Sequence, residues 1–142
     1  MLKIHQINRT KFPIDTKIIE NIATSVLKKV SNIDSPVSIA FVGENTIKKL
    51  NKEYRGIDSV TDVLTFIYRD DDQYGEIVMC PSKITRNARK FSETFEKELY
   101  RTLIHGLLHL SGYDHERDNA QADDMMKLQE YFLNSIPRKE DS

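Results

Sequence analysis

The stretch that decides the fold is residues 99–115, LYRTLIHGLLHLSGYDH. Leucine and isoleucine recur on nearly every side of a helix in this stretch, a pattern typical of a helix buried at the centre of a domain. Gly112 follows the last leucine, at a position suited to a left-handed C-terminal cap. We therefore predict a central helix over residues 94–110 that ends at a glycine break.

The segments around this helix show strand and helix patterns without a strict alternation of the two. Alternating or β-branched apolar runs predict strands over residues 2–8, 36–43, 62–68 and 75–80. Apolar residues at helical spacing predict helices that begin near Pro13, Glu44, Pro81 and Asp118. This order favours an α+β protein in which a small sheet packs on helices.

Composition limits the classes of protein that the chain can belong to. A length of 142 residues suits one domain, so we expect residues 1–142 to form a single unit. The net charge of −1 excludes a global positive field, so binding to a polyanion requires local charge asymmetry or a bound cation. No apolar run approaches the ~20 residues of a membrane helix, and the lone Cys80 excludes an internal disulfide. We predict a cytoplasmic protein without a membrane partner, with Cys80 as a small buried hydrophobic residue.

Three of the four histidines, His105, His109 and His115, lie within one short segment. Residues four apart on a helix are about 40° apart around its axis, so His105 and His109 share a face. Gly112 allows the chain to leave the helix and bring His115 towards them. Three imidazoles with an open fourth position are typical of a catalytic site for one Zn²⁺ ion. A packed histidine cluster is the alternative, but close imidazoles repel when protonated unless a cation pairs them.

Gly106 bears on the class of substrate. The histidine spacing has the register of a zinc-protease motif, in which a glutamate after the first histidine is the general base. Gly106 occupies that position, so peptide hydrolysis lacks its base unless Glu76 or Glu116 supplies one. Glycine within a helix costs about 1 kcal/mol relative to alanine. We hypothesise that the absent side chain opens the floor of a cleft to a bulky anionic substrate.

Basic residues on the predicted helices include one candidate for catalysis. Most of them, among them Arg86, Arg89 and Lys90, fit solvated helix faces. Arg55 differs because it lies at a helix end beside Gly56, where a guanidinium can reach over a cleft. Guanidinium and zinc both attract the charge of a phosphodiester, so we predict Arg55 as a catalytic residue.

Three stretches resemble one known family. HGLLHLSGYDH (105–115) closely resembles the signature of the YbeY endoribonucleases, bacterial metalloproteins of ribosomal RNA maturation. LNKEYRGIDSVTDVLTF (50–66) resembles the family's L-N-x-x-Y-R-G segment followed by T-D-V-L-S-F. YGEIVMC (74–80) resembles its G-D-I-x-I strand. Together these stretches cover the chain from about residue 36 to residue 115 in the order of the family.

The resemblance implies a fold, an activity and partners. The fold would be a zincin-like α+β domain, with a small mixed four-stranded sheet and about five helices around a central ligand-bearing helix. His105, His109 and His115 would bind one Zn²⁺, and Arg55 would match the family's functionally important arginine. The activity would be metal-dependent cleavage of single-stranded RNA in ribosomal RNA processing, notably at the 3′ end of the small-subunit RNA, and in ribosome quality control. The small ribosomal subunit and its proteins would be the partners.

The chain departs from the family pattern at two positions beside the expected cleft. Thr65 replaces a common serine and keeps a hydroxyl, and Glu76 replaces a common aspartate and keeps a carboxylate. Asp114 matches the family's G-Y-D-H and either orients an imidazole by accepting its hydrogen bond or caps the turn. We place Thr65, Glu76, Asp114 and Gly106 in or beside the cleft.

Two routes of cleavage and two rival functions remain open at this point. Either water attacks the phosphorus, or the adjacent 2′-OH attacks and leaves a cyclic phosphate first, with zinc and Arg55 stabilising the added charge. One rival is a zinc hydrolase of another substrate class, such as peptides. The other is a non-catalytic ribosome assembly factor with a structural zinc ion.

Overall fold

The structure is a computed structural model that describes residues 1–113 and 119–137. Within these ranges the chain forms four strands and five helices. Their order is β1 (Ile4–Asn8), α1 (Thr16–Val30), β2 (Val37–Phe41), α2 (Glu44–Arg55), β3 (Val63–Ile67), β4 (Gly75–Met79), α3 (Pro81–Lys90), α4 (Phe95–Leu110) and α5 (Asn119–Asn134). Every strand and helix falls in a segment that the sequence pattern predicts.

The first helix begins later than Pro13 because a capping residue fixes its start. The Asp15 side chain accepts a hydrogen bond from the backbone N–H of Ile18 at 3.2 Å, which satisfies one of the donors exposed at a helix N-terminus. Thr94 does the same for α4 by accepting from the N–H of Lys97 at 3.2 Å. Asp118, near which the last helix was predicted to begin, lies outside the described residues.

The sheet is mixed, and its order is β1-β2-β4-β3. Strands β1, β2 and β4 are parallel, whereas β3 runs antiparallel to β4 and forms one edge of the sheet. The exposed aspartates Asp70, Asp71 and Asp72 lie in the turn between β3 and β4. The predicted α+β class with a small mixed four-stranded sheet is confirmed.

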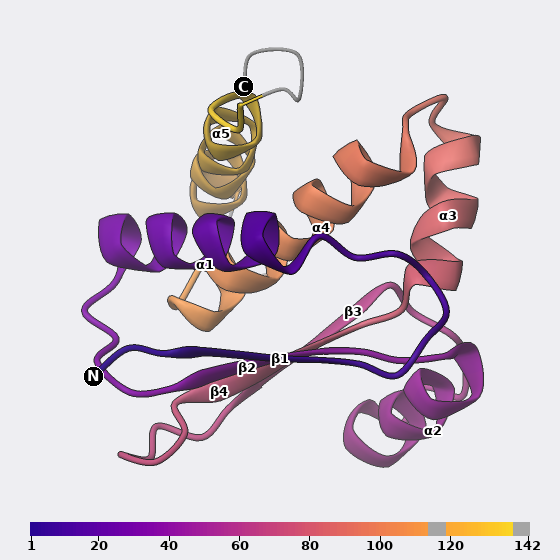
Figure 1. Ribbon diagram of the computed structural model, residues 1–142, viewed down its shortest axis with the longest axis horizontal. Helices are drawn as coiled ribbons and strands as arrows, with labels where there is room; N and C mark the ends of the chain where they lie inside the picture. The colour runs from indigo at the N-terminus through magenta and orange to yellow at the C-terminus, as the bar shows by residue number, and fades with distance from the viewer. Residues whose placement is uncertain (114–118, 138–142) are drawn as a thin grey trace.

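Helices cover the two faces of the sheet unequally. Figure 1 shows α1, α3, α4 and α5 on one face and α2 alone on the other. The larger core lies under the four helices and includes Ile39 and Ile77 of the sheet. A second cluster under α2 includes Val78, Ile47 and Cys80, whose side chain is fully buried as expected. Burial raises the pKa of the Cys80 thiol.

Helix α4 lies at the centre of the larger core. Leu103, Ile104, Leu107 and Leu108 are fully buried, and α4 packs against α1, α3, α5, β3 and β4. At its end, Gly112 has a φ of +103°, and its N–H donates to the carbonyl of His109 at 3.0 Å. The central helix and its glycine break are therefore confirmed.

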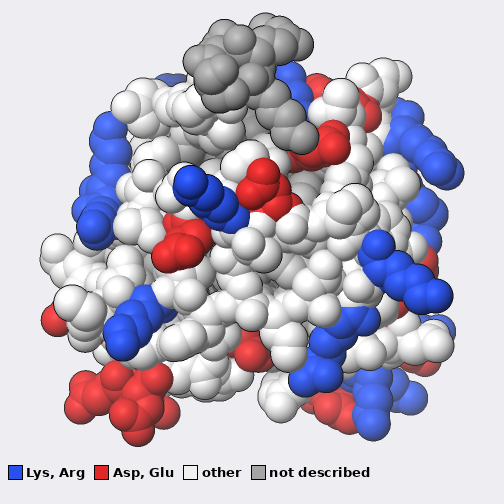
Figure 2. Space-filling model, in the orientation of Figure 1, with Lys and Arg blue, Asp and Glu red and all other residues white. Residues whose placement is uncertain are grey.

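Charges of both signs are mixed on the surface. Figure 2 shows basic and acidic side chains interspersed on the visible face, with an acidic cluster at the lower left, where Figure 1 has the β3–β4 turn. Among residues 1–113 and 119–137, no helix has the length and apolar character needed to cross a membrane. Because charges of both signs are mixed on this face, the attraction of an anion must arise within a local site.

Candidate active site

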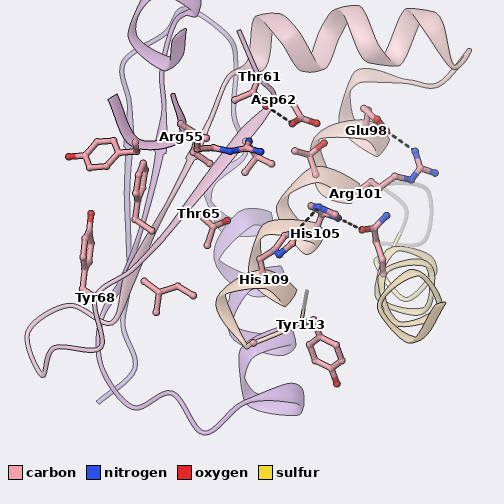
Figure 3. A pocket seen from close by; sticks show the side chains of 18 of the residues that line it. Arg55, Thr61, Asp62, Thr65, Tyr68, Glu98, Arg101, His105, His109 and Tyr113 are labelled. Atoms are coloured by element: carbon pink, nitrogen blue, oxygen red, sulfur yellow. Dashed lines mark hydrogen bonds and ion pairs between the residues drawn. The ribbon is translucent and has the colours of Figure 1, made fainter. Parts of the chain in front are cut away.

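A cavity of about 890 Å³ opens between α4, the edge strand β3 and the end of α2. Its volume is within the range typical of ligand-binding pockets. Four of the side chains predicted for the site line this cavity, namely Arg55, Thr65, His105 and His109. They come from three elements that are distant in the chain, and the fold brings them to one place (Figure 3).

His105 and His109 form a close pair on one face of α4. Their Nε2 atoms lie 3.0 Å apart, and their ring centroids lie 4.5 Å apart. Both side chains are partly exposed, although the helix around them is buried. The spacing of four residues thus directs two imidazole nitrogens at nearly the same point in the cavity.

Gln129 holds the His105 ring from the opposite side. This residue comes from α5, is only 7% exposed, and places its Oε1 2.9 Å from Nδ1 of His105. A carboxamide oxygen can only accept, so this contact requires the proton of His105 on Nδ1. In the neutral imidazole Nε2 is then unprotonated, which is the form that binds a metal.

The donor set of this pair suits a metal ion such as zinc. The two Nε2 atoms lie 3.0 Å apart, so two imidazole nitrogens could bind one ion, and the contact with Gln129 favours the metal-binding tautomer of His105. The predicted third ligand His115, its neighbour Asp114 and Glu116 lie outside the described residues. Within residues 1–113 and 119–137, no set of three His, Cys, Asp or Glu side chains is arranged to hold a metal.

Arg55 reaches the cavity from the last position of α2. Gly56 ends this helix with a φ of +71°, a conformation that favours glycine, and its N–H donates to the Lys52 carbonyl at 3.0 Å. The buried Asn51 fixes the following loop by donating from Nδ2 to the Ser59 carbonyl at 3.0 Å. Figure 3 shows the Arg55 guanidinium directed towards the helix that carries the histidines.

The arginines near the cavity differ in their ion pairs. Arg101 of α4 contacts three carboxylates, at 2.8 Å to Glu98, 3.5 Å to Glu130 and 3.7 Å to Glu93. No described carboxylate forms an ion pair with the exposed Arg55. Its charge is thus available to an anionic ligand, whereas that of Arg101 is neutralised within the protein.

Arg86 lies on the surface, which agrees with its interpretation as part of a solvated helix face. It forms an ion pair with Glu44 at 2.5 Å on the surface between α2 and α3. Hydrogen bonds from Arg86 and Ser82 lower the pKa of the Glu44 carboxyl. Arg86, Arg89 and Lys90 do not line the cavity.

Thr65 and Glu76 lie on opposite faces of the sheet. Thr65 belongs to the face of β3 that is directed towards α4, and Figure 3 places it beside His109. Glu76 has the same parity on β4 as Val78, which packs under α2, so its side chain is directed away from the histidines. Glu76 was expected in the cleft, but it is not among the residues that line the cavity, and its carboxyl does not face the histidines. Burial raises the pKa of its carboxyl.

Gly106 contributes to the packing of α4 on the sheet, whereas the sequence suggested that it opens the floor of the cleft. A Cβ atom added there would lie 3.2 Å from Cγ2 of Ile77 and 3.4 Å from Cγ2 of Val63. The absent side chain therefore lets α4 approach the sheet closely. The hypothesis that Gly106 opens the cleft floor to substrate is wrong, because the residue is buried against β3 and β4.

Several cavity residues were not predicted from the sequence. They include Asp62, Glu98, Thr102 and Gln129, together with Tyr54 and Tyr68. Gln129 carried a usable signal, since it lies between Met125 and Phe132 on the apolar stripe of α5. A polar side chain in an apolar stripe is buried and needs a hydrogen-bonding partner.

Fold and cavity define a small α+β protein in which imidazole and guanidinium groups share one polar cleft. Comparison with known proteins identifies the family. Residues 4–137 match the family model described as Endoribonuclease YbeY. The chain therefore belongs to the YbeY endoribonuclease family, as its three motifs indicated.

Relatives and a solved structure agree with this assignment. The Endoribonuclease YbeY of Thermosipho melanesiensis is 45% identical over 123 residues, which cover 87% of this chain and 86% of the relative. That of Chlorobium phaeobacteroides is 34% identical over 92% of this chain and 94% of its own. A solution structure of a Thermotoga maritima protein matches with a TM-score of 0.67 and 39% identity, covering 94% of this chain and 89% of that one.

Proposed function

We propose that this protein is a zinc-dependent endoribonuclease that cleaves single-stranded RNA. The observation that carries the proposal is the pair of Nε2 atoms 3.0 Å apart in the cavity that also receives Arg55. Imidazole donors and a guanidinium without a described carboxylate partner suit a phosphodiester, which is anionic and hydrolysed with the help of metals. Family membership supports RNA as the substrate.

His105, His109 and His115 would hold the zinc ion. Gln129 would keep His105 in the tautomer that binds metal, because its Oε1 accepts the proton of Nδ1 at 2.9 Å. When bound, zinc supplies Lewis-acid catalysis and lowers the pKa of water towards neutrality.

Arg55 would stabilise the negative charge that grows on the phosphoryl oxygens during cleavage. Its guanidinium offers several N–H donors in a planar fork, which matches two phosphoryl oxygens at once. The hydroxyl of Thr65, on the facing strand, can donate one further hydrogen bond to the phosphate or ribose. Together these groups bind and orient the scissile phosphate against α4.

Substrate and biological role follow from the cleft and from the family resemblance. A cleft bounded by an edge strand and a helix suits unpaired RNA, whose bases can be splayed apart. By resemblance to the family, we propose a role in ribosomal RNA processing, notably at the 3′ end of the small-subunit RNA, and in ribosome quality control. The small ribosomal subunit and its proteins would be the partners, in the cytoplasm.

The two rival functions have less support. A zinc peptidase needs a carboxylate base beside the metal. Of the two residues named for that role, Glu76 projects from the other face of the sheet and Glu116 lies outside the described residues, while Glu98 of the cavity is paired with Arg101. A non-catalytic assembly factor with structural zinc does not require an arginine directed into the same cavity as the ligands.

The test is metal analysis of the purified chain together with cleavage of an end-labelled single-stranded RNA, with and without chelator. We expect about one zinc ion per chain, and cleavage that chelator abolishes and added zinc restores. His109→Ala should lower cleavage roughly a thousandfold or more, since the metal contributes several kcal/mol to catalysis. Retained circular dichroism would show that the fold persists.

Two outcomes would contradict the proposal. Full cleavage after complete removal of metal would exclude catalytic zinc, and unfolding of His109→Ala would favour structural zinc. Analysis of the RNA ends separates the two routes of cleavage, because attack by the 2′-OH first leaves a cyclic phosphate.

A further inference from the structure

The cavity continues around the edge strand β3 to a group of aromatic side chains. Tyr54, Phe66 and Tyr68 line the same cavity as Arg55 and the histidines. Phe66 lies on β3 on the face opposite Thr65, and Tyr68 is the first residue after the strand. Figure 3 shows Tyr68 on the side of β3 away from His105 and His109. We call Tyr54, Phe66 and Tyr68 the aromatic ledge.

The rings of the ledge are unusually exposed for aromatic side chains. Tyr54 is 66% exposed and Tyr68 is 46% exposed. Tyr54 and Phe66 contact each other edge to face, with centroids 4.9 Å apart, so the Phe66 ring supports Tyr54 without covering it. Their apolar faces are thus open to a ligand that can stack.

Charges flank the ledge on both sides. Arg55 follows Tyr54 at the end of α2, and the exposed Arg69 follows Tyr68; both arginines line the cavity. Neither arginine forms an ion pair with a described carboxylate. The acidic run Asp70–Asp72 lies just beyond Arg69 and would repel a polyanion, so this end of the site stops there.

Rings flanked by arginines match the chemistry of single-stranded nucleic acid. Each base offers an apolar face to an aromatic ring, and each phosphate offers a charge to an arginine. Burial, then the nearby charges of Glu76 and Tyr54, raise the pKa of Tyr68, so its phenol is neutral near pH 7 and does not repel phosphates.

We propose that the aromatic ledge is a base-stacking subsite for single-stranded RNA next to the scissile phosphate. The strand of RNA would cross the edge of β3, with one phosphate near Arg55 and the histidines and the adjoining bases on Tyr54 and Tyr68. This inference rests on the proposed function for its substrate. Beyond the proposed function, it states that the bases next to the scissile phosphate are bound outside the reaction centre. It also explains why these bases must be unpaired, since only unpaired bases can stack on the rings.

The test measures binding of a fluorescein-labelled single-stranded RNA to the full chain by fluorescence anisotropy, with chelator present so that the RNA stays intact. We expect Tyr68→Leu to raise Kd about tenfold, and Tyr54→Leu to have a similar effect, because each loses one stacked base. Tyr68→Phe keeps a ring, so it should bind at least about fivefold tighter than Tyr68→Leu. Tyr131→Leu is the matched control, since Tyr131 is 51% exposed on α5 outside this cavity.

Two further substrates sharpen the result. An RNA of the same length with abasic positions should bind the unsubstituted protein and Tyr68→Leu equally, because it has no bases to stack there. The RNA annealed to its complement should bind both proteins weakly, because its bases are paired. Unchanged Kd for Tyr54→Leu and Tyr68→Leu would overturn the subsite, as would no RNA binding by the original chain. Such a result would point to a protein partner for the ledge.

Cleavage measured with zinc separates this inference from the proposed function. Loss of stacking should raise KM while kcat changes by less than about threefold, because the ledge lies outside the reaction centre. A chain that binds RNA through the ledge but does not cleave it would contradict the proposed function alone. A chain that cleaves RNA with unchanged Kd in both leucine variants would overturn the subsite alone.

Discussion

The two walls of the cleft differ in how their polar side chains are held. On the wall formed by α4 and α5, polar groups contact one another: Arg101 pairs with Glu98 and Glu130, and His105 contacts Gln129 and His109. On the wall formed by β3 and the end of α2, Arg55, Tyr54 and Tyr68 are exposed, and Arg55 has no described carboxylate partner.

This difference separates two tasks that a binding site must combine. Groups that are already hydrogen-bonded keep a fixed position, which a site needs for accurate geometry. Groups that project into solvent can exchange water for ligand without first breaking an ion pair. We therefore expect substitutions on the wall of α4 and α5 to change metal affinity or stability. Substitutions on the wall of β3 and α2 should change the binding or cleavage of RNA.

The largest expected difference is between the two arginines. Arg55→Ala should lower the rate constant for cleavage of single-stranded RNA by about a hundredfold, because it removes a charged donor that stabilises the transition state. The melting temperature should stay the same, since Arg55 is exposed and lacks a described ion pair. Single-turnover cleavage and thermal denaturation of the same preparation measure both quantities.

Arg101→Ala is the matched control on the other wall. It leaves the buried Glu98 without its partner, so the free energy of unfolding should fall by about 1–3 kcal/mol. Cleavage by the folded variant should fall much less than for Arg55→Ala. Equal losses of stability in the two variants, or equal losses of activity, would remove the distinction between the walls.

Gln129→Leu tests the tautomer argument with a smaller expected effect. Loss of the acceptor on Nδ1 of His105 should weaken zinc binding by about 10–100-fold, the usual effect of removing the partner of a histidine ligand. Competition with a chromophoric chelator measures the affinity directly. Gln129→Glu keeps an acceptor oxygen and should bind zinc more tightly than the leucine variant. Unaltered zinc affinity in Gln129→Leu would show that the contact does not position the ligand.

Gly106→Ala should have the smallest effect. The added Cβ would meet Ile77 and Val63 at 3.2 and 3.4 Å, and this crowding opposes the gain of about 1 kcal/mol in helix propensity. We expect the free energy of unfolding, from urea denaturation, to fall by less than about 1 kcal/mol, while Gly106→Leu loses about 3 kcal/mol. If Gly106→Ala kept its stability but no longer cleaved RNA, the hypothesis that this position faces the substrate would be supported again.

The fold was largely predictable because its signals are local. Apolar periodicity, capping residues and glycine breaks gave each strand and helix, and the apolar surround of residues 99–110 indicated the central place of α4. Strand order was not predictable, since β4 lies between β2 and β3. That order depends on which strands pair over long distances in the chain, and no local residue pattern records it.

The site was predictable only in part, for the same reason. His105, His109 and Arg55, which the motifs singled out, line one cavity. Glu76 and Gly106 do not line it, because the direction of a side chain depends on the register and depth of the packed element. Gln129 was missed because its contact joins residues on two helices, at positions 24 apart.

The edge position of β3 has a consequence for self-association. Among the described strands, β3 pairs only with β4, so one side of its backbone lacks a strand partner and could template the addition of another chain. Proteins with such edges limit aggregation by keeping the strand short and by placing charges near it. β3 has five residues, with Arg55 beside it and Arg69 and Asp70–Asp72 after it. We therefore expect the charges that bound the cleft to disfavour intermolecular β-sheet formation at this edge as well.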